Sequence, residues 1–129
     1  MSMETVGSEK PKVLVVDDEP LLGQTIQLGL DDEFSIELAS NGKEALDYLF
    51  GEQTFDLILC DLSLPDISGA QVYTEVAARA PQYVQRFVVM TGGAFSAELQ
   101  NFMSGYQGRV LNKPFTLNEL EALARELSA

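Results

Sequence analysis

Side chains able to do chemistry follow directly on short apolar runs in this sequence. Asp17 and Asp18 follow the run VLVV, Asp61 follows LILC, Thr91 follows FVVM, and Lys113 closely follows RVL. Carboxylates that crowd together either hold a proton or need a cation. Carboxylate oxygens without histidine or an available cysteine favour a hard ion, Mg²⁺ before Ca²⁺.

A lysine, a threonine and carboxylates at one rim are also the parts of a phosphoryl site. The Lys113 ammonium would offset phosphoryl charge, Thr91 would donate a hydrogen bond, and the backbone near Gly92 would let an oxygen approach closely. A carboxylate can itself accept a phosphoryl group, which makes Asp61 a candidate acceptor. Each residue alone is most often a cap, a turn residue or a surface charge, so the site depends on their joint placement.

The composition removes several other kinds of site. The 129 residues include no histidine, which excludes histidine general bases, histidine metal ligands and a phosphohistidine on this chain. Cys60 is the single cysteine, so no internal disulfide can form, and its place in an apolar run favours a buried hydrophobe. The net charge of −12 repels phosphate backbones and anionic membranes, so we expect no direct contact with nucleic acid or membrane.

The organisation of the chain is simple. Residues 1–10 are polar and lack periodicity, and we interpret them as a disordered or vector-derived tail. Residues 11–129 contain no repeat and no linker, which favours a single domain. Neither a bilayer-spanning apolar run nor a signal-peptide pattern is present, so we expect a cytoplasmic protein.

Apolar patterns place the candidate residues at the ends of strands. Short aliphatic runs bounded by polar or turn residues are typical of buried strands. Helical spacing of apolar residues follows each run, introduced by Pro20 or by the capping residues Asn41, Ser68, Ser96 and Thr116. The predicted strands cover residues 13–16, 34–39, 56–61, 87–90 and 109–111.

Strands that alternate with helices indicate βα units, a parallel sheet and right-handed crossovers. The sequence therefore predicts an α/β fold, a flavodoxin-like (βα)5 doubly wound sandwich. Its five-stranded parallel sheet would have the order 2-1-3-4-5, with helices on both faces. The first and third strands are then neighbours, roughly 5 Å apart. We expect Asp17, Asp18 and Asp61 to meet in one crevice.

Four motifs at successive strand ends resemble those of a known family. They are VLVVDDEP (13–20), LILCDLSLPDISG (57–69), VVMTGG (88–93) and VLNKPF (110–115). In this order they are similar to the response-regulator receiver domain of two-component signal transduction, and the resemblance covers essentially residues 11–128. Each motif is weak alone, whereas the four together are highly specific.

The resemblance implies a role for each acidic residue. Asp61 would be the phosphoacceptor, taking a phosphoryl group from a phosphohistidine of a sensor histidine kinase or a histidine phosphotransfer protein. Asp18 and Asp61 would bind Mg²⁺ directly together with the backbone carbonyl of Ser63, while Asp17 would act through water. The downstream target is not implied.

The resemblance also implies phosphoryl contacts and a switch. Lys113 would contact a phosphoryl oxygen, and Thr91 would reorient to hydrogen-bond the phosphoryl group and report its presence. Gly92 and Leu62 belong to the same set of contacts. In this family the peptide bond before the matching proline is usually cis, so we expect a cis bond between Lys113 and Pro114.

One position departs from the family pattern. Many receivers carry an aromatic residue where this chain has Val110, and that ring swings inward together with the threonine. Val110 cannot act by the same motion, so we expect the signal to leave by another face. The stretches TGGAF (91–95) and NKPF (112–115) also resemble receivers fused to sensor kinases, so the chain could be the receiver of a hybrid kinase.

Two alternatives stay open beside the phosphorylated receiver. A pseudo-receiver would use the same fold only for docking, although the complete set of site residues disfavours it. A hydrolase of the aspartyl-phosphate type would need a second aspartate two residues beyond the nucleophile, where Ser63 stands, so we expect no enzyme. We interpret Glu19 as a solvated charge and predict no role for Tyr73, Tyr83 and Tyr106.

Overall fold

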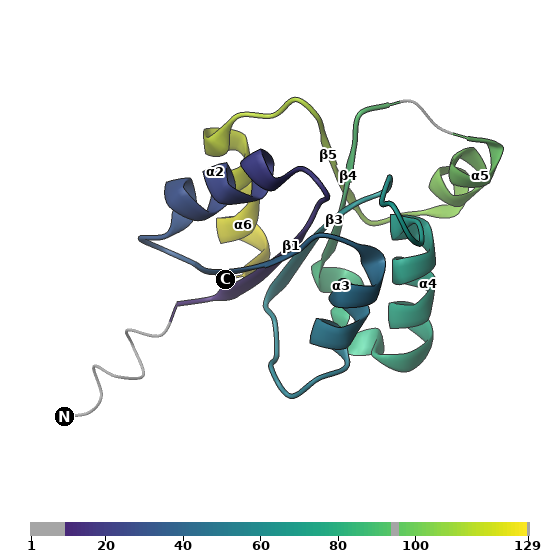
Figure 1. Cartoon of the computed structure of the whole chain (residues 1–129), viewed down its shortest axis with the longest axis horizontal. Helices are drawn as coiled ribbons and strands as arrows, with labels where there is room; N and C mark the ends of the chain where they lie inside the picture. The colour runs from purple at the N-terminus through teal and green to yellow at the C-terminus, as the bar shows by residue number, and fades with distance from the viewer. Residues whose placement is uncertain (1–9, 94–95, 129) are drawn as a thin grey trace.

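The computed structural model describes residues 10–93 and 96–128, so most of the expected N-terminal tail lies outside the described residues. In this part of the chain, five strands alternate with helices (Figure 1). Each expected strand is present, with ends that differ from the predicted ones by one residue at most. The strands are β1 (Lys12–Val16), β2 (Ser35–Ala39), β3 (Leu57–Asp61), β4 (Phe87–Thr91) and β5 (Arg109–Asn112).

The helices begin where the capping residues predict. Asn41, Ser68 and Ser96 each accept a hydrogen bond from a backbone N–H of the first turn. One helix was not expected: the stretch after Ala80 forms a 3-10 helix that leads into β4. The helices are α2 (Pro20–Leu30), α3 (Gly42–Leu49), α4 (Gly69–Arg79), η1 (Pro81–Arg86), α5 (Ala97–Gly105) and α6 (Leu117–Ser128).

The sheet is parallel throughout, with the order β2-β1-β3-β4-β5. This confirms the predicted flavodoxin-like doubly wound fold. In the register, Val16 pairs with Cys60, Asp61 with Met90, and Thr91 with Asn112. The carboxyl ends of four neighbouring strands therefore reach the same edge of the sheet, where open α/β folds place their sites.

Helices cover both faces of this sheet (Figure 1). On one face, α2 and α6 pack against Leu57 and Leu59 of β3 through Ile26 and Leu120. On the other face, α3, α4 and α5 cover the alternate side chains of the same strand. Strand β3 is completely buried, as the unbroken apolar run predicts.

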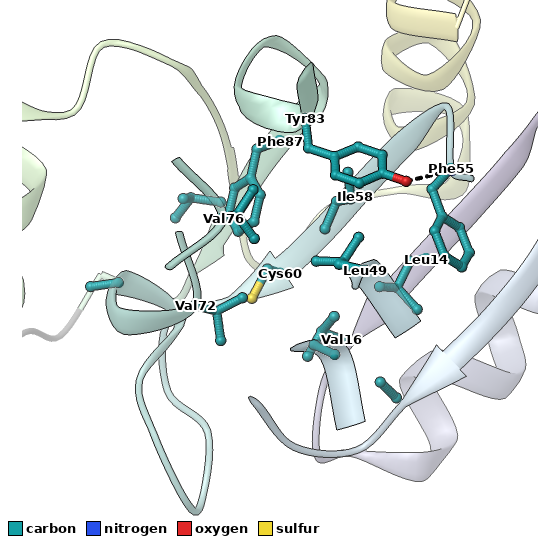
Figure 2. Close-up of a cluster of buried hydrophobic side chains, with 14 of the residues drawn as sticks. Leu14, Val16, Leu49, Phe55, Ile58, Cys60, Val72, Val76, Tyr83 and Phe87 are labelled. Carbon is teal, nitrogen blue, oxygen red and sulfur yellow. Dashed lines mark hydrogen bonds between the residues drawn. The ribbon is translucent and has the colours of Figure 1, made fainter. Parts of the chain in front are cut away.

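Figure 2 shows the second of these clusters, in which Cys60 and Ile58 of β3 lie among side chains from α3 and α4. Burial raises the pKa of the Cys60 thiol, consistent with a buried hydrophobe. The Tyr83 hydroxyl accepts a hydrogen bond of 3.2 Å from the Phe55 N–H (Figure 2). Tyr83, for which the sequence predicted no role, thus ties η1 to the chain entering β3.

Across residues 10–93 and 96–128, none of the helices combines the length and the apolar character that crossing a bilayer would require.

Candidate functional site

Three carboxylates converge at the carboxyl ends of β1 and β3. Asp17 and Asp18 follow β1, Asp61 ends β3, and one ligand oxygen from each lies within 4.8 Å of the others. Asp17 and Asp61 are buried, whereas Asp18 is exposed. The neighbouring positions of β1 and β3 in the sheet cause this convergence, as the predicted strand order requires.

Lys113 reaches the same place from the end of β5. Its ammonium donates hydrogen bonds of 2.6 Å to Asp17 Oδ2 and 2.8 Å to Asp61 Oδ2. Its backbone N–H is 2.8 Å from the Thr91 carbonyl oxygen, and the peptide bond that joins it to Pro114 is cis. Lys113 and Asp17, 96 positions apart in the sequence, therefore form a partly buried ion pair.

Glu19 lies closer to this group than the sequence predicted. We interpreted it as a solvated charge, and its side chain is indeed exposed, but Oε1 lies 3.6 Å from the Lys113 ammonium. Its backbone N–H also donates a hydrogen bond of 2.9 Å to Asp17 Oδ1. The start of α2 is thereby attached to the carboxylate cluster. In the sequence, Glu19 directly follows Asp17 and Asp18, and this closeness was the available signal.

The charges of the cluster perturb one another. Burial raises the pKa of Asp61, and nearby Asp17 adds to this, while hydrogen bonds from Lys113 and the Ser63 N–H act in the opposite direction. For Lys113, burial disfavours the ammonium, but the hydrogen bonds to Asp17 and Asp61 outweigh it and raise the pKa. One lysine faces three carboxylates, so the site has an excess of negative charge.

The backbone after Asp61 is tightly constrained. The Ser63 N–H donates a 3.0 Å hydrogen bond to Asp61 Oδ1, and the Gly69 N–H donates one of 2.9 Å to the Leu62 carbonyl oxygen. A Cβ atom at Gly69 would lie 2.2 Å from the Asp61 carbonyl oxygen. Only glycine therefore fits there, a requirement that the sequence analysis missed although Gly69 closes the quoted motif.

Leu62 was expected among the phosphoryl contacts, and this role stays a prediction. Its side chain is buried in the core, its N–H donates to the Met90 carbonyl oxygen at 3.1 Å, and its carbonyl oxygen accepts from Gly69. Both backbone groups are thus already used inside the fold. On the same segment, the Ser63 N–H bonds the Asp61 carboxylate.

Comparison with known proteins agrees with this geometry. The family model for the response regulator receiver domain matches residues 13–125 of the chain. The chain belongs to this family. The receiver is 32% identical over 125 residues to the response regulator Rre1 of Synechocystis sp., covering 95% of the chain and 53% of Rre1. It is 33% identical over 110 residues to the transcriptional regulatory protein SrrA of Staphylococcus aureus, covering 84% of the chain and 44% of SrrA.

Receivers also occur inside much longer relatives. A hybrid signal transduction histidine kinase A of Dictyostelium discoideum is 28% identical over 121 residues, which are 90% of this chain and 6% of that protein. The receiver thus spans about half the length, or less, of these curated relatives.

Solved structures give the same fold. The chemotaxis response regulator CheY4 of Vibrio cholerae superposes with a TM-score of 0.77 at 26% identity, over 92% of this chain and 99% of that one. The receiver domain of the sensor histidine kinase PA1611 from Pseudomonas aeruginosa PAO1 gives 0.80 at 23% identity, over 93% and 98%. That structure is described with a magnesium ion coordinated in its active site cleft.

The threonine of this receiver is held by its own turn. Thr91 is buried at the end of β4, and its Oγ1 accepts a 3.0 Å hydrogen bond from the Gly93 N–H. Gly93 has φ +95°, and a Cβ atom at Gly92 or Gly93 would meet nothing within 4 Å. Gly92 is exposed, so its backbone is accessible at the rim of the site.

Val110, which the resemblance places where many receivers have an aromatic residue, lies in β5. It pairs with Val89 in the sheet and is 37% exposed. The rings of this region cluster elsewhere: Tyr106 stacks on Phe102 at 5.3 Å and meets Tyr73 edge-on at 5.2 Å. These ring contacts join α4 to the end of α5.

Tyr106 also has a polar role that the sequence did not predict. Its hydroxyl lies 3.1 Å from the Phe87 carbonyl oxygen and 3.0 Å from that of Arg109, so it links the chain after α5 to the starts of β4 and β5. A Cβ atom at Gly108 would lie 2.4 Å from this hydroxyl. The glycine two residues after the tyrosine was the only local signal of this packing.

Proposed function

We propose that this receiver accepts a phosphoryl group on Asp61 in a Mg²⁺-dependent two-component phosphorelay and then changes conformation. The observation that carries the proposal is the contact of Asp61 with Lys113 beside two further carboxylates. The residues 11–129 would act as one receiver unit. Its phosphodonor would be the phosphohistidine of a sensor histidine kinase or a histidine phosphotransfer protein.

The donor set fits a magnesium ion. Mg²⁺ prefers oxygen ligands and is usually held by one or two carboxylates together with water and phosphate oxygens. Asp18, Asp61 and the Ser63 carbonyl would hold it, with Asp17 acting through water. When bound, the ion would neutralise charge on both the carboxylates and the phosphoryl oxygens. The receiver of PA1611, which shares this fold, is described with magnesium in its cleft.

The protein residues would do the remaining chemistry. A carboxylate oxygen of Asp61 would attack phosphorus, a P–O bond would form, and the P–N bond to the donor imidazole would break, with the electron pair leaving on the imidazole nitrogen. The Lys113 ammonium would stay near the transferred group and stabilise its charge. Thr91 would exchange its bond from the Gly93 N–H for a bond to a phosphoryl oxygen.

The signal that this receiver passes on depends on the whole protein. We propose that the receiver signals to a partner or an attached domain, because the relatives it matches are about twice its length or longer. With Val110 in the aromatic position, Thr91 would transmit its movement through the backbone toward α5. A receiver of this kind is a signalling module and not an enzyme, and Ser63 in place of an acid agrees with that.

Mass spectrometry of the intact protein tests the proposal. Wild-type protein incubated with acetyl phosphate and Mg²⁺ should gain one phosphoryl group, and Asp61→Asn should gain none. Asp47→Asn, which changes an exposed aspartate of α3, is the matched control and should be phosphorylated like wild type. Absence of the adduct in wild type, with acetyl phosphate and with a phosphorylated kinase, would refute the proposal.

The docking-only alternative predicts a different titration. A pseudo-receiver would show no heat of binding at millimolar Mg²⁺ in isothermal titration calorimetry, and beryllofluoride would leave backbone signals unchanged. The proposed function instead predicts Mg²⁺ binding, and beryllofluoride with Mg²⁺ should shift the amide signals near Thr91 in the NMR spectrum.

A further inference from the structure

The segment that connects β3 to α4, residues 62–68, carries an acidic side chain with an unusual pair of partners. The Asp66 carboxylate accepts a hydrogen bond from the Gly42 N–H at Oδ1 and from the Lys43 N–H at Oδ2, both at 2.8 Å. These donors lie 24 and 23 residues earlier, at the start of α3. Asp66 therefore joins the segment after the proposed phosphoacceptor to a separate helix.

The start of α3 depends on this connection. The first N–H groups of a helix have no partner within the helix. The Asn41 side chain satisfies one of them, with Oδ1 accepting from the Glu44 N–H at 2.8 Å. Asp66 satisfies those of Gly42 and Lys43, the first two residues of the helix. A carboxylate at the positive end of a helix is also favoured by the helix dipole.

The electrostatics of Asp66 agree with this arrangement. Desolvation raises the pKa of its carboxyl, but the hydrogen bonds from the Gly42, Lys43 and Ile67 N–H groups outweigh it and lower the pKa. The charged form is therefore the one that the fold stabilises.

Packing strengthens the same junction. Ile67, next to Asp66, fills the space beside Gly42, where a Cβ atom would lie 2.4 Å from Ile67 Cγ1. Two residues after Ile67, Gly69 lies against the Asp61 carbonyl oxygen. Residues 62–68 are thus attached to α3 on one side and to the end of β3 on the other.

We propose that Asp66 is a positioning residue for the Asp61 site. It fixes residues 62–68 against α3 and thereby holds the Ser63 backbone, whose N–H bonds Asp61 Oδ1 and whose carbonyl would face the metal ion. This inference rests on the proposed function, because it assigns Asp66 to the same Mg²⁺ and phosphoryl site. Asp66 itself would touch neither the ion nor the phosphoryl group.

Two variants separate positioning from simple stabilisation of α3. Asp66→Ala removes the two hydrogen bonds that residues 62–68 accept from the start of α3. Asn41→Ala removes a side-chain hydrogen bond at the same helix end and leaves residues 62–68 unchanged. The measurements are the Mg²⁺ dissociation constant from calorimetry at constant ionic strength, the free energy of unfolding in urea, and the chemical shift of the Ser63 amide.

Asp66→Ala should weaken Mg²⁺ binding roughly 10-fold, the lower edge of the loss seen when a group that orients a metal ligand is removed. It should also shift the Ser63 amide signal. Asn41→Ala should destabilise the protein yet leave both Mg²⁺ affinity and the Ser63 signal as in wild type. Phosphorylation of Asp66→Ala by acetyl phosphate should recover at saturating Mg²⁺.

The outcomes distinguish the two proposals. Equal Mg²⁺ affinity in wild type and Asp66→Ala, or equal weakening in Asn41→Ala, would overturn the role of Asp66 and leave the proposed function intact. Absence of Mg²⁺ binding in wild type would overturn both. If Asp66→Ala does not fold, Asp66→Asn carries the test: it keeps one acceptor oxygen, so a smaller loss of affinity is expected and an unchanged affinity refutes the inference.

Discussion

The segments that follow β3 and β4 are held in opposite ways. After β3, Asp66 bonds two N–H groups of α3, and Gly69 packs so closely on Asp61 that a methyl group would overlap it. After β4, as far as Gly93, the side-chain attachment is the bond from the Gly93 N–H to Thr91, and both glycines have open space around them. One site segment is fixed and the other lightly held.

The difference matches two physical requirements. Ligands of a metal ion and of a transferred group must be held within fractions of an ångström, which requires rigid neighbours. A segment that reports a change must have two conformations of similar free energy, so it is drawn from the less stable parts of a fold. Helix α5, which follows β4, has Leu99 as its buried residue and stands to one side in Figure 1.

The largest expected effect comes from filling the tight contact after β3. Gly69→Ala should lower the free energy of unfolding by about 3 kcal/mol, the upper end for overpacking, because the methyl group would meet backbone atoms. Urea unfolding measures this, and Mg²⁺ affinity should fall as well. Gly92→Ala, with nothing near its Cβ position, should change stability by less than about 0.5 kcal/mol. Equal losses in the two variants would contradict the contrast between the segments.

Gly93→Ala probes the turn that holds Thr91. At φ +95° an alanine is strained, and the expected loss of stability is about 1.5 kcal/mol because the left-handed backbone crowds Cβ. The strain should also free the Thr91 hydroxyl, seen as increased exchange broadening of nearby amide signals in NMR relaxation dispersion. A variant as stable as wild type, with unchanged relaxation, would show that this turn does not restrain Thr91.

Tyr106→Phe tests how the region after β4 is attached at its far end. Loss of the hydroxyl removes the single O–H donor that lies between the two carbonyl oxygens, and the expected cost is about 1 kcal/mol. Amide hydrogen exchange in α5 should quicken. Tyr73→Phe keeps the ring contact with Tyr106 and removes a hydroxyl that has no partner in the described part of the chain. If Tyr106→Phe costs no more stability than Tyr73→Phe, the Tyr106 hydroxyl does not attach this region and ring packing alone does.

The smallest effect should depend on pH. Because the folded-state pKa of Asp66 lies below its ordinary value, its charge stabilises the fold above the unfolded pKa of about 3.9 and loses this effect as the pH falls through the folded value. Asp66→Asn, which keeps one acceptor oxygen but loses the charge beside the start of α3, should therefore cost about 0.5 kcal/mol at neutral pH. The cost should vanish in strong acid.

Urea titrations of wild type and Asp66→Asn at a series of pH values measure this difference. Asp47→Asn, in an exposed pair with Lys43 on α3, serves as the reference. A difference that persists unchanged to low pH would mean that the Asp66 charge is not what fixes residues 62–68.

Local patterns predicted much of this molecule. Apolar runs and caps gave every strand and five of the six helices, and the alternation of strands and helices gave the sheet order. The convergence of Asp17, Asp18 and Asp61 followed from that order. Unpredicted features depend on contacts distant in sequence. One example is the Leu62 N–H, which extends the sheet to the Met90 carbonyl oxygen.

What the sequence determined by itself was which residue types stand at the ends of which strands, because hydrophobic periodicity and capping act over a few residues. The tertiary structure alone decided that Asp66 caps a helix 24 residues away, that Tyr106 holds two strand carbonyls, and that Gly69 leaves no room for a methyl group. Each of these depends on the path of a connecting segment in space, and spacing along the chain does not contain that path.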